Sequence, residues 1–365
     1  MIDVRAQSVY HPQTWQRFRC CAGRRKPHGL EETRRQKHRL RHGNQHVRPV
    51  GRRPFQRSDL NCDNRFDHPM IITTLGAGAG GGVPQWNCGC HNCAEARAGR
   101  IAGMTQSSVA VSAGGGDWLL LNASPDLRQQ LAATPALFPL DLRHSPLRAV
   151  IVTNADVDHI AGLLTLREKT PFRLFATAGT LAILCDNPVF RVLDAKLVEQ
   201  MEIALDRPFC PLPGLEVTAF AVPGKIALYL EGDDVPDTLA LGEQTVGLRI
   251  ASEGKVFFYL PGCAALPDWL CARLADADLL MFDGTVWADD DMPRLGAGSK
   301  TGARMGHLAM SGPEGSLARL AHLTGQRVYT HINNTNPVLA PASAERAAVA
   351  AAGWSVAQDG MEILL

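Results

Sequence analysis

The 365-residue sequence has no run of about 18 apolar residues, so no membrane-spanning helix is predicted. Its N-terminus lacks the apolar central region and the small-residue cleavage site of a secretory signal. The Gly-rich stretch at 76–82 lacks the Gly-Lys-Ser/Thr ending of a nucleotide-binding loop, which favours a close-packed turn beside an active-site mouth. The functional information therefore lies in the charges, the cysteines and the polar motifs.

Charge is divided unevenly along the chain. Residues 1–69 contain 16 of the 37 Lys and Arg but 6 of the 36 Asp and Glu, so this segment carries +10 and residues 70–365 carry −9. The basic segment has no sustained apolar period, and we expect it to be disordered. Such an arm can bind nucleic acid or an anionic membrane. We favour instead an upstream extension from a misassigned start site, because Met70 begins a stretch typical of a domain's first strand.

The second segment, residues 70–365, has the composition of a folded domain. Short apolar stretches typical of strands alternate with Gly/Pro turns and helical stretches. Strands are predicted at 71–75, 118–122, 148–153, 215–222, 245–250, 256–260, 279–282 and 327–330. Helices are predicted at 161–169, 268–275, 315–323 and 344–352, the last capped by Ser343. Several strands end in side chains with metal-binding or acid-base capacity, which predicts an α+β sheet sandwich with sites on its end loops. Aromatic content of 6% and the negative charge argue against a nucleic-acid partner for this domain.

One strand end carries the run Asn154-Ala155-Asp156-Val157-Asp158-His159. This run resembles the His-x-His-x-Asp-His signature of the metallo-β-lactamase superfamily. Asp158 and His159 match the signature, whereas Asn154 and Asp156 stand where its first two histidines belong. The resemblance implies a metallo-β-lactamase-like αββα sandwich in which half of a two-metal site is altered.

Further positions of the superfamily's metal site can be matched along the chain. Asp283 and His331 follow apolar runs and match the ligands that, with Asp158 and His159, hold the second metal. Lys225 follows a Pro-Gly turn at the position of the first metal's third histidine. Lysine is a poor ligand, so we predict one metal ion. Its ligands would be Asp158, His159, Asp283 and His331, and the substrate contacts would be Asn154, Asp156 and Lys225.

The predicted ligand set indicates which metals fit. Two His with one or two carboxylates resembles the facial arrangement of non-haem Fe(II), which has open positions for O₂ and substrate. The same ligands can hold Zn²⁺ or Mn²⁺ and activate water. His307, after a Gly/Ser-rich stretch, is a candidate acid, base or substrate contact, although an ordinary loop histidine is equally consistent with the sequence.

Three of the ten cysteines, Cys88, Cys90 and Cys93, lie within six residues. Their Cys-x-Cys-x-x-Cys spacing allows three thiolates to converge on one Zn²⁺, which we interpret as structural. A fourth ligand would come from His91 or from the turn at 331–336. The alternative to a zinc site is that these residues are three ordinary thiols. A metal clip suits a reducing cytosol better than a disulfide framework does, so we expect a cytoplasmic protein.

Three motifs together give a closer resemblance: the Gly-rich opening from Met70 to Cys88, the run at 154–159, and His331-Ile332-Asn333-Asn334-Thr335-Asn336-Pro337. Over residues 70–365 the chain resembles the coenzyme PQQ synthesis protein B family. The resemblance implies a role in pyrroloquinoline quinone (PQQ) biosynthesis. The ligand would be PQQ or a peptide-derived precursor built from crosslinked Glu and Tyr. The sequence leaves open whether the protein forms a homodimer.

The resemblance leaves three functions to compare. We favour iron-dependent hydroxylation of the tyrosine-derived ring over a carrier that delivers PQQ or its precursor to the periplasm, because a carrier needs no converging metal ligands. A metal-dependent peptide hydrolase is disfavoured by the altered first-metal positions. Lys225, Arg128, Arg249 and Arg304 are candidate partners for substrate carboxylates, although solvated arginines explain the sequence equally well.

Overall fold

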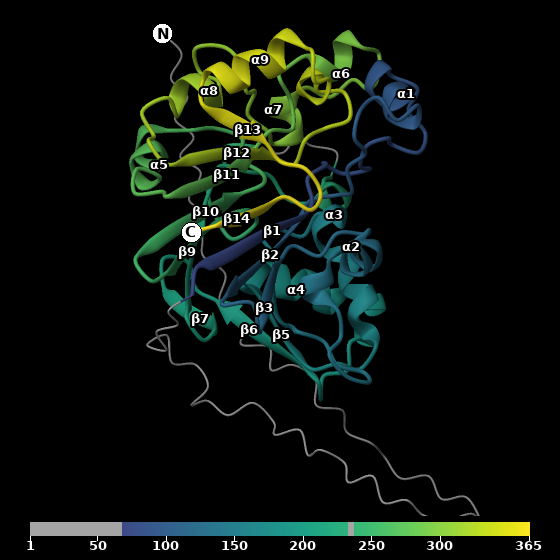
Figure 1. Ribbon diagram of the computed structural model, residues 1–365, viewed down its shortest axis with the longest axis vertical. Coiled ribbons are helices and arrows are strands. Elements are labelled where there is room, and N and C mark those ends of the chain that lie inside the picture. The colour runs from purple at the N-terminus through teal and green to yellow at the C-terminus, as the bar shows by residue number, and fades with distance from the viewer. Residues whose placement is uncertain (1–67, 233–236) are drawn as a thin grey trace, which may run out of the picture. The chain divides into compact units, whose positions relative to one another are not determined.

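The computed structural model describes residues 68–232 and 237–365, and the predicted basic extension, apart from its last two residues, lies outside this part. The described chain contains two seven-stranded mixed sheets (Figure 1). The first sheet has the order β14-β1-β2-β3-β4-β5-β6. Its strands are β1 (Met70–Gly76), β2 (Ser108–Ala113), β3 (Trp118–Leu121), β4 (Leu147–Ile151), β5 (Phe172–Thr177), β6 (Val198–Ile203) and β14 (Glu362–Leu364).

The second sheet has the order β13-β12-β11-β10-β9-β8-β7. Its strands are β7 (Pro208–Leu212), β8 (Leu215–Ala221), β9 (Val246–Ser252), β10 (Lys255–Leu260), β11 (Leu279–Asp283), β12 (Gln326–Thr330) and β13 (Trp354–Val356). Strands β10 to β13 run parallel to one another, as do β3 to β6 in the first sheet. The carboxyl ends of parallel neighbours meet at one edge of a sheet, which is where the predicted ligands follow β4, β11 and β12.

Alternating side chains build the four layers of the domain. Leu119 and Leu121 of β3 point into a core shared with Phe220 of the second sheet, while Trp118 and Leu120 point to the opposite face. On that face the first sheet is covered by α2 (Leu127–Ala133), the 3₁₀ segment η3 (Ala161–Arg167) and α4 (Ala178–Asp186). Helices α5 (Asp268–Arg273), α8 (Ser316–Arg319) and α9 (Ala344–Ala351) cover the second sheet (Figure 1). The predicted α+β sandwich of the αββα type is therefore confirmed.

The structure also contains shorter helical segments. They are α1 (His91–Arg97), α3 (Val157–Ile160), α6 (Asp291–Arg294) and α7 (Gly302–Met305), with 3₁₀ segments η2 (Pro135–Leu137), η4 (Pro188–Val192), η5 (Leu228–Leu230) and η6 (Pro337–Leu339). Within the described residues, no helix is both long enough and apolar enough to cross a bilayer.

The helices predicted at 161–169 and 315–323 differ from the structure. Of the stretch 315–323, only α8 (Ser316–Arg319) is helical. All eight predicted strands are present, and Ser343 caps α9 by accepting a hydrogen bond from the Arg346 amide. Residues 161–167 form a 3₁₀ segment rather than an α-helix, so that prediction is wrong. The reason is close backbone packing, because the Gly162 amide donates to the Ala123 carbonyl at 2.8 Å.

Gly162 fixes the helix that carries the predicted ligands, which leads to a stability prediction. A Cβ at this position would meet the carbonyl oxygen of Ser124 and the backbone of Ala123, neither of which can yield like a side chain. Gly162→Ala should lower the free energy of unfolding by about 1–3 kcal/mol, measured by denaturant titration. Gly116→Ala is the control, because a Cβ there meets nothing within 4 Å. Equal stability of the two variants would contradict this account of α3.

Candidate metal centre

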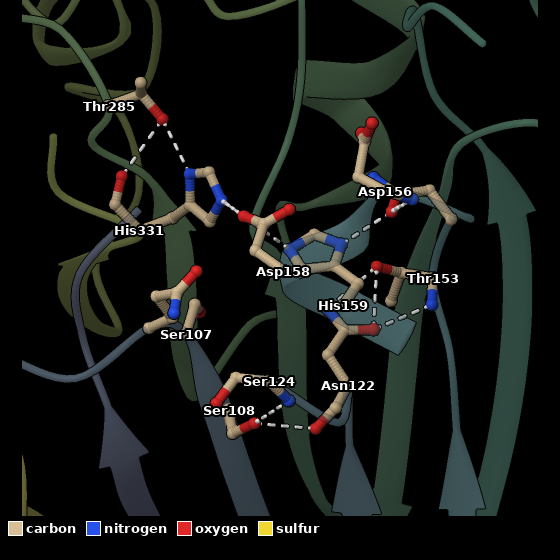
Figure 2. Close-up of polar contacts among 12 residues, drawn as sticks. Ser107, Ser108, Asn122, Ser124, Thr153, Asp156, Asp158, His159, Thr285 and His331 are labelled. Carbon is tan, nitrogen blue, oxygen red and sulfur yellow. Dashed lines mark hydrogen bonds and ion pairs between the residues drawn. The ribbon is translucent and has the colours of Figure 1, made fainter. Parts of the chain in front are cut away.

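Three strand ends bring the predicted ligands together. Asp158 and His159 lie on α3 just after β4, Asp283 is the last residue of β11, and His331 follows β12. Figure 2 shows His331 between Thr285 and Asp158, with the His159 ring on the other side of Asp158. His331 has a φ of 58°, which is uncommon for a residue with a side chain and marks a position where strain is tolerated.

Asp158, His159 and His331 form the first of two ligand groups. One potential ligand atom from each lies within 4.8 Å of the others. Asp158 Oδ2 is 3.1 Å from His331 Nε2 and 4.0 Å from His159 Nε2. The two imidazole rings are nearly perpendicular, with centroids 5.4 Å apart. This is a two-His, one-carboxylate set of the kind that leaves further coordination positions open.

His159 is prepared to act as a ligand. Its Nδ1 donates to the Asn154 carboxamide oxygen at 2.7 Å, which leaves the lone pair on Nε2. That Nε2 is buried and has no hydrogen-bond partner among the described residues. Burial lowers the pKa of His159, which keeps the imidazole neutral. A buried lone pair without a donor costs free energy that a bound cation would recover.

The charges of the group are coupled. Burial would raise the pKa of Asp158, but His159 and His331 outweigh it and hold that pKa well below its usual range. Burial would likewise lower the pKa of His331, but the hydrogen bond and charge of Asp158 raise it. His331 therefore holds a proton at Nε2, donated to Asp158, and a cation binding there would compete with that proton.

Asp283, His307 and His331 form the second group, again within 4.8 Å. His307 Nδ1 donates to Asp283 Oδ2 at 2.7 Å, and the His307 ring stacks on His331 with centroids 5.1 Å apart. Asp283 also accepts hydrogen bonds from the Cys263 amide and the Thr285 hydroxyl. The four predicted ligands thus form two groups that share His331, and His307 belongs to the site.

Thr285 is a site residue that the sequence analysis missed. Its hydroxyl lies 2.8 Å from His331 Nδ1 and donates to Asp283 Oδ1 at 2.7 Å. It therefore links the two carboxylate-bearing groups and fixes the orientation of the His331 ring. Its position two residues after a strand end was the only available signal.

The residues at the altered first-metal positions have distinct surroundings. Asn154 is buried and accepts the hydrogen bond from His159 Nδ1. Asp156 is partly exposed, with its Oδ1 4.0 Å from Lys225 Nζ. Lys225 also lies 3.3 Å from Glu231. Lys225 thus bridges Asp156 and Glu231, with the longer ion pair to Asp156.

The predicted carboxylate-binding arginines separate. Arg304 pairs with Glu231 beside Lys225. Arg249, on β9, pairs with Asp276. Arg128 is an exposed residue of α2. The Gly-rich turn lies at the site, as predicted, because a Cβ on Gly80 would be 3.4 Å from Asp158 Oδ2.

The three cysteines of the motif converge at the start of α1. The sulfurs of Cys88, Cys90 and Cys93 lie within 4.8 Å of one another. Burial raises the pKa of Cys90 to about 11. The Asn334 carboxamide lies over all three, with its nitrogen 3.1 Å from Cys88, 3.3 Å from Cys93 and 3.6 Å from Cys90. His91 is exposed on α1, so the turn at 331–336 supplies the nearer fourth group.

Comparison with known proteins agrees with this geometry. Residues 117–332 match the model of the β-lactamase superfamily domain. The chain is 56% identical over 296 residues to coenzyme PQQ synthesis protein B of Ruegeria pomeroyi, covering 81% of this chain and 100% of that protein. It is also 56% identical over 298 residues to the protein of that name from Methylorubrum extorquens, covering 80% and 99%.

Solved structures show the same relationship. The crystal structure of Zn²⁺-bound PqqB from Methylobacterium extorquens superposes with a TM-score of 0.79 at 56% identity, covering 81% of this chain and 100% of that chain. A diphosphatase of the PhnP family superposes with a TM-score of 0.58 at 20% identity, covering 81% and 97%. The second likeness concerns the fold alone.

Proposed function

The chain belongs to the coenzyme PQQ synthesis protein B family within the β-lactamase superfamily, and from this premise we propose that it oxygenates the tyrosine-derived intermediate of PQQ biosynthesis at a single iron ion. A place in PQQ biosynthesis follows from the family. The metal, the reaction and the substrate are the proposal. PQQ or its peptide-derived precursor would be the ligand.

One observation carries the proposal. Asp158, His159 and His331 form a two-His, one-carboxylate group, and the His159 Nε2 lone pair is buried without a partner among the described residues. Asn154, Asp156 and Lys225 stand where a first metal would need ligands, and Lys225 brings a positive charge there. This arrangement favours one metal ion over a bridged pair. A bound Fe(II) would supply O₂ activation, for which such ligand sets leave positions open.

The chain's own residues prepare this chemistry. Asn154 fixes the tautomer of His159 through Nδ1, and Thr285 orients His331. Because His307 donates from Nδ1 to Asp283, its Nε2 is free to accept a proton from a ring hydroxyl or to return one. Asp283 holds His307 in that orientation, so we assign His307 as the acid-base residue and Asp283 as its positioning partner.

The test separates this function from its two alternatives. Protein purified without oxygen is analysed for iron and zinc, then mixed with the tyrosine-derived substrate and a two-electron reductant, with and without O₂. The reductant is needed because insertion of one oxygen atom into the ring leaves the other to be reduced to water. An oxygenase forms product only with O₂ and iron. A carrier of PQQ to the periplasm binds PQQ without metal and consumes no O₂. A peptide hydrolase forms product without O₂ once Zn²⁺ or Mn²⁺ is added.

Asn154 provides a prediction about positioning. Asn154→Ala removes the acceptor for His159 Nδ1, so the ring loses its fixed tautomer and orientation. The affinity for the active-site metal should fall by about 10–100-fold, measured by competition with a chelator. Asn187→Ala, at the C-cap of α4, is the matched control and should leave metal affinity unchanged. Equal affinities of the two variants would contradict the supporting role of Asn154.

We also assign Cys88, Cys90 and Cys93 to a structural Zn²⁺. The convergence of the three sulfurs within 4.8 Å of one another supports this assignment. Asn334 is the candidate fourth ligand through its carboxamide oxygen, because the oxygen and nitrogen ends of a carboxamide exchange by a half-turn of the group. Thiolates that saturate Zn²⁺ leave it little Lewis acidity, so this ion would stabilise the fold.

A further inference from the structure

Glu231 has three cationic partners beside the metal centre. Its side chain is 7% exposed, and its carboxylate lies 2.8 Å from Arg304, 3.3 Å from Lys225 and 3.7 Å from Lys300. With Asp156, which lies 4.0 Å from Lys225, three cations face two carboxylates, so the group keeps a net charge of +1. The hydrogen bond with Arg304, reinforced by Lys225 and Lys300, lowers the pKa of Glu231 to about 2, so it is ionised at neutral pH.

The three cations, Lys225, Lys300 and Arg304, form a basic cradle that adjoins the site. Lys225 Nζ lies 4.0 Å from Asp156, the residue that precedes the ligand helix α3. The stem of Lys225 lies against Gly306, since a Cβ there would be 3.2 Å from Lys225 Cγ. The next residue, His307, contacts Asp283. Lys225 thus contacts Asp156 and Gly306, which are close chain neighbours of Asp158 in the first ligand group and of His307 in the second.

Glu231 fills the cradle incompletely. Arg304 Nη1 is buried and has no hydrogen-bond acceptor among residues 68–232 and 237–365, and Glu231 Oε1 has no donor of good geometry there. Arg304 therefore uses one arm of a guanidinium group that can bind a carboxylate with two. A carboxylate entering from solvent could engage both arms, which the tethered side chain does not do.

The segment that carries Glu231 is lightly packed. Its preceding residues Leu228, Tyr229 and Leu230 are 57%, 43% and 43% exposed. Two hydrogen bonds hold it to the site: the Tyr229 hydroxyl donates to the Ala155 carbonyl at 2.9 Å, and the Leu228 amide donates to Asp156 at 3.3 Å. Moving Glu231 aside costs little buried apolar area, and segments of this kind open at low free energy.

We propose that Lys225, Lys300 and Arg304 form the binding site for a carboxylate of the substrate, and that Glu231 occupies this site until the substrate displaces it. The ligand class follows from the present occupant, which is itself a carboxylate. This proposal rests on the proposed function, because it supplies an anchor for a carboxylate-bearing substrate beside the metal centre.

The experiment measures binding of PQQ, which carries three carboxylates, to metal-free protein without oxygen. Glu231→Gln removes the competing charge and should tighten PQQ binding by about tenfold. Arg304→Gln should weaken it by about tenfold. The trimethyl ester of PQQ has no free carboxylate, so its affinity should be the same for both variants and the wild type. Glu216→Gln, an exposed position on β8, is the control for a change of one charge.

A second variant guards against misfolding. Glu231→Asp keeps the net charge of the protein, but its shorter side chain reaches the three cations less well. It should therefore also tighten PQQ binding. The proposal is overturned if neither Glu231 variant binds PQQ more tightly than Glu216→Gln, or if Arg304→Gln binds it as the wild type does. Because this assay needs neither metal nor O₂, its failure leaves the oxygenase proposal standing, and an absent oxygenase activity leaves the binding result intact.

Discussion

Replacing His331 by alanine should abolish O₂-dependent product and reduce the active-site metal content more than any other single change. His331 is the residue common to both ligand groups, so its loss breaks each of them. It leaves Asp158 as a buried carboxylate without its closest partner at 3.1 Å, and it leaves the Thr285 hydroxyl without its nitrogen contact. Loss of a supporting contact alone costs about 10–100-fold in metal affinity, and loss of a ligand exceeds that range.

The measurement combines elemental analysis with single-turnover assays. Variant and wild type are loaded with Fe(II) without oxygen, freed of excess metal, analysed, and then exposed to substrate, a two-electron reductant and O₂. Asp158→Ala should behave like His331→Ala, since both belong to the first group. His322→Ala, at an exposed turn position, is the matched histidine control and should retain metal and product. Unchanged product in His331→Ala would reject the metal centre as the site of reaction.

Much of the fold could be predicted because apolar strands leave a strong local signal. The stretch at 279–282 is a fully buried parallel strand, β11, whose residues are apolar on both faces. Six strands were not predicted: β2, β5, β6, β7, β13 and β14. The edge strands β13 and β14 have three residues each, as in Trp354–Val356, which are too few for a pattern. The helix expected at 161–169 was wrong for a tertiary reason, the approach of the Ala123 backbone to Gly162.

The residues of the site likewise divide into those that the sequence could predict and those that it could not. Asp158, His159, Asp283 and His331 were predicted from the resemblance to the superfamily's metal-site positions. Each follows an apolar run, and the ends of parallel strands meet at one edge of a sheet. The roles of supporting residues were not predictable. Thr285 acts through a contact with a residue 46 positions away, and Glu231 meets Arg304 across 73 positions. No local spacing encodes such contacts, since they exist only after both sheets have packed.

Cys90→Ser should remove the structural Zn²⁺ and lower thermal stability while leaving the chemistry recoverable. The three sulfurs lie at the start of α1, and Asn92 of that helix donates to the carbonyls of Asn334 and Asn336. The cluster therefore fastens α1 to the turn that begins at His331. If free zinc exceeds its dissociation constant about a thousandfold, binding stabilises the folded state by about 4 kcal/mol. Loss of the site should lower Tm by roughly 8 °C or more.

The control is Cys271→Ser, a thiol-to-hydroxyl exchange outside the cluster, where the side chain donates to the Leu266 carbonyl. A chelator should lower the Tm of the wild type and of Cys271→Ser by more than that of Cys90→Ser, which has only the active-site metal to lose. Product formation by Cys90→Ser should recover at low temperature with iron supplied, because Asp158, His159 and His331 are intact. Loss of iron with zinc retained in Cys90→Ser would mean that the two metal assignments are exchanged. In that case the reaction would take place at the cysteine cluster, which the turn at 331–336 joins to His331.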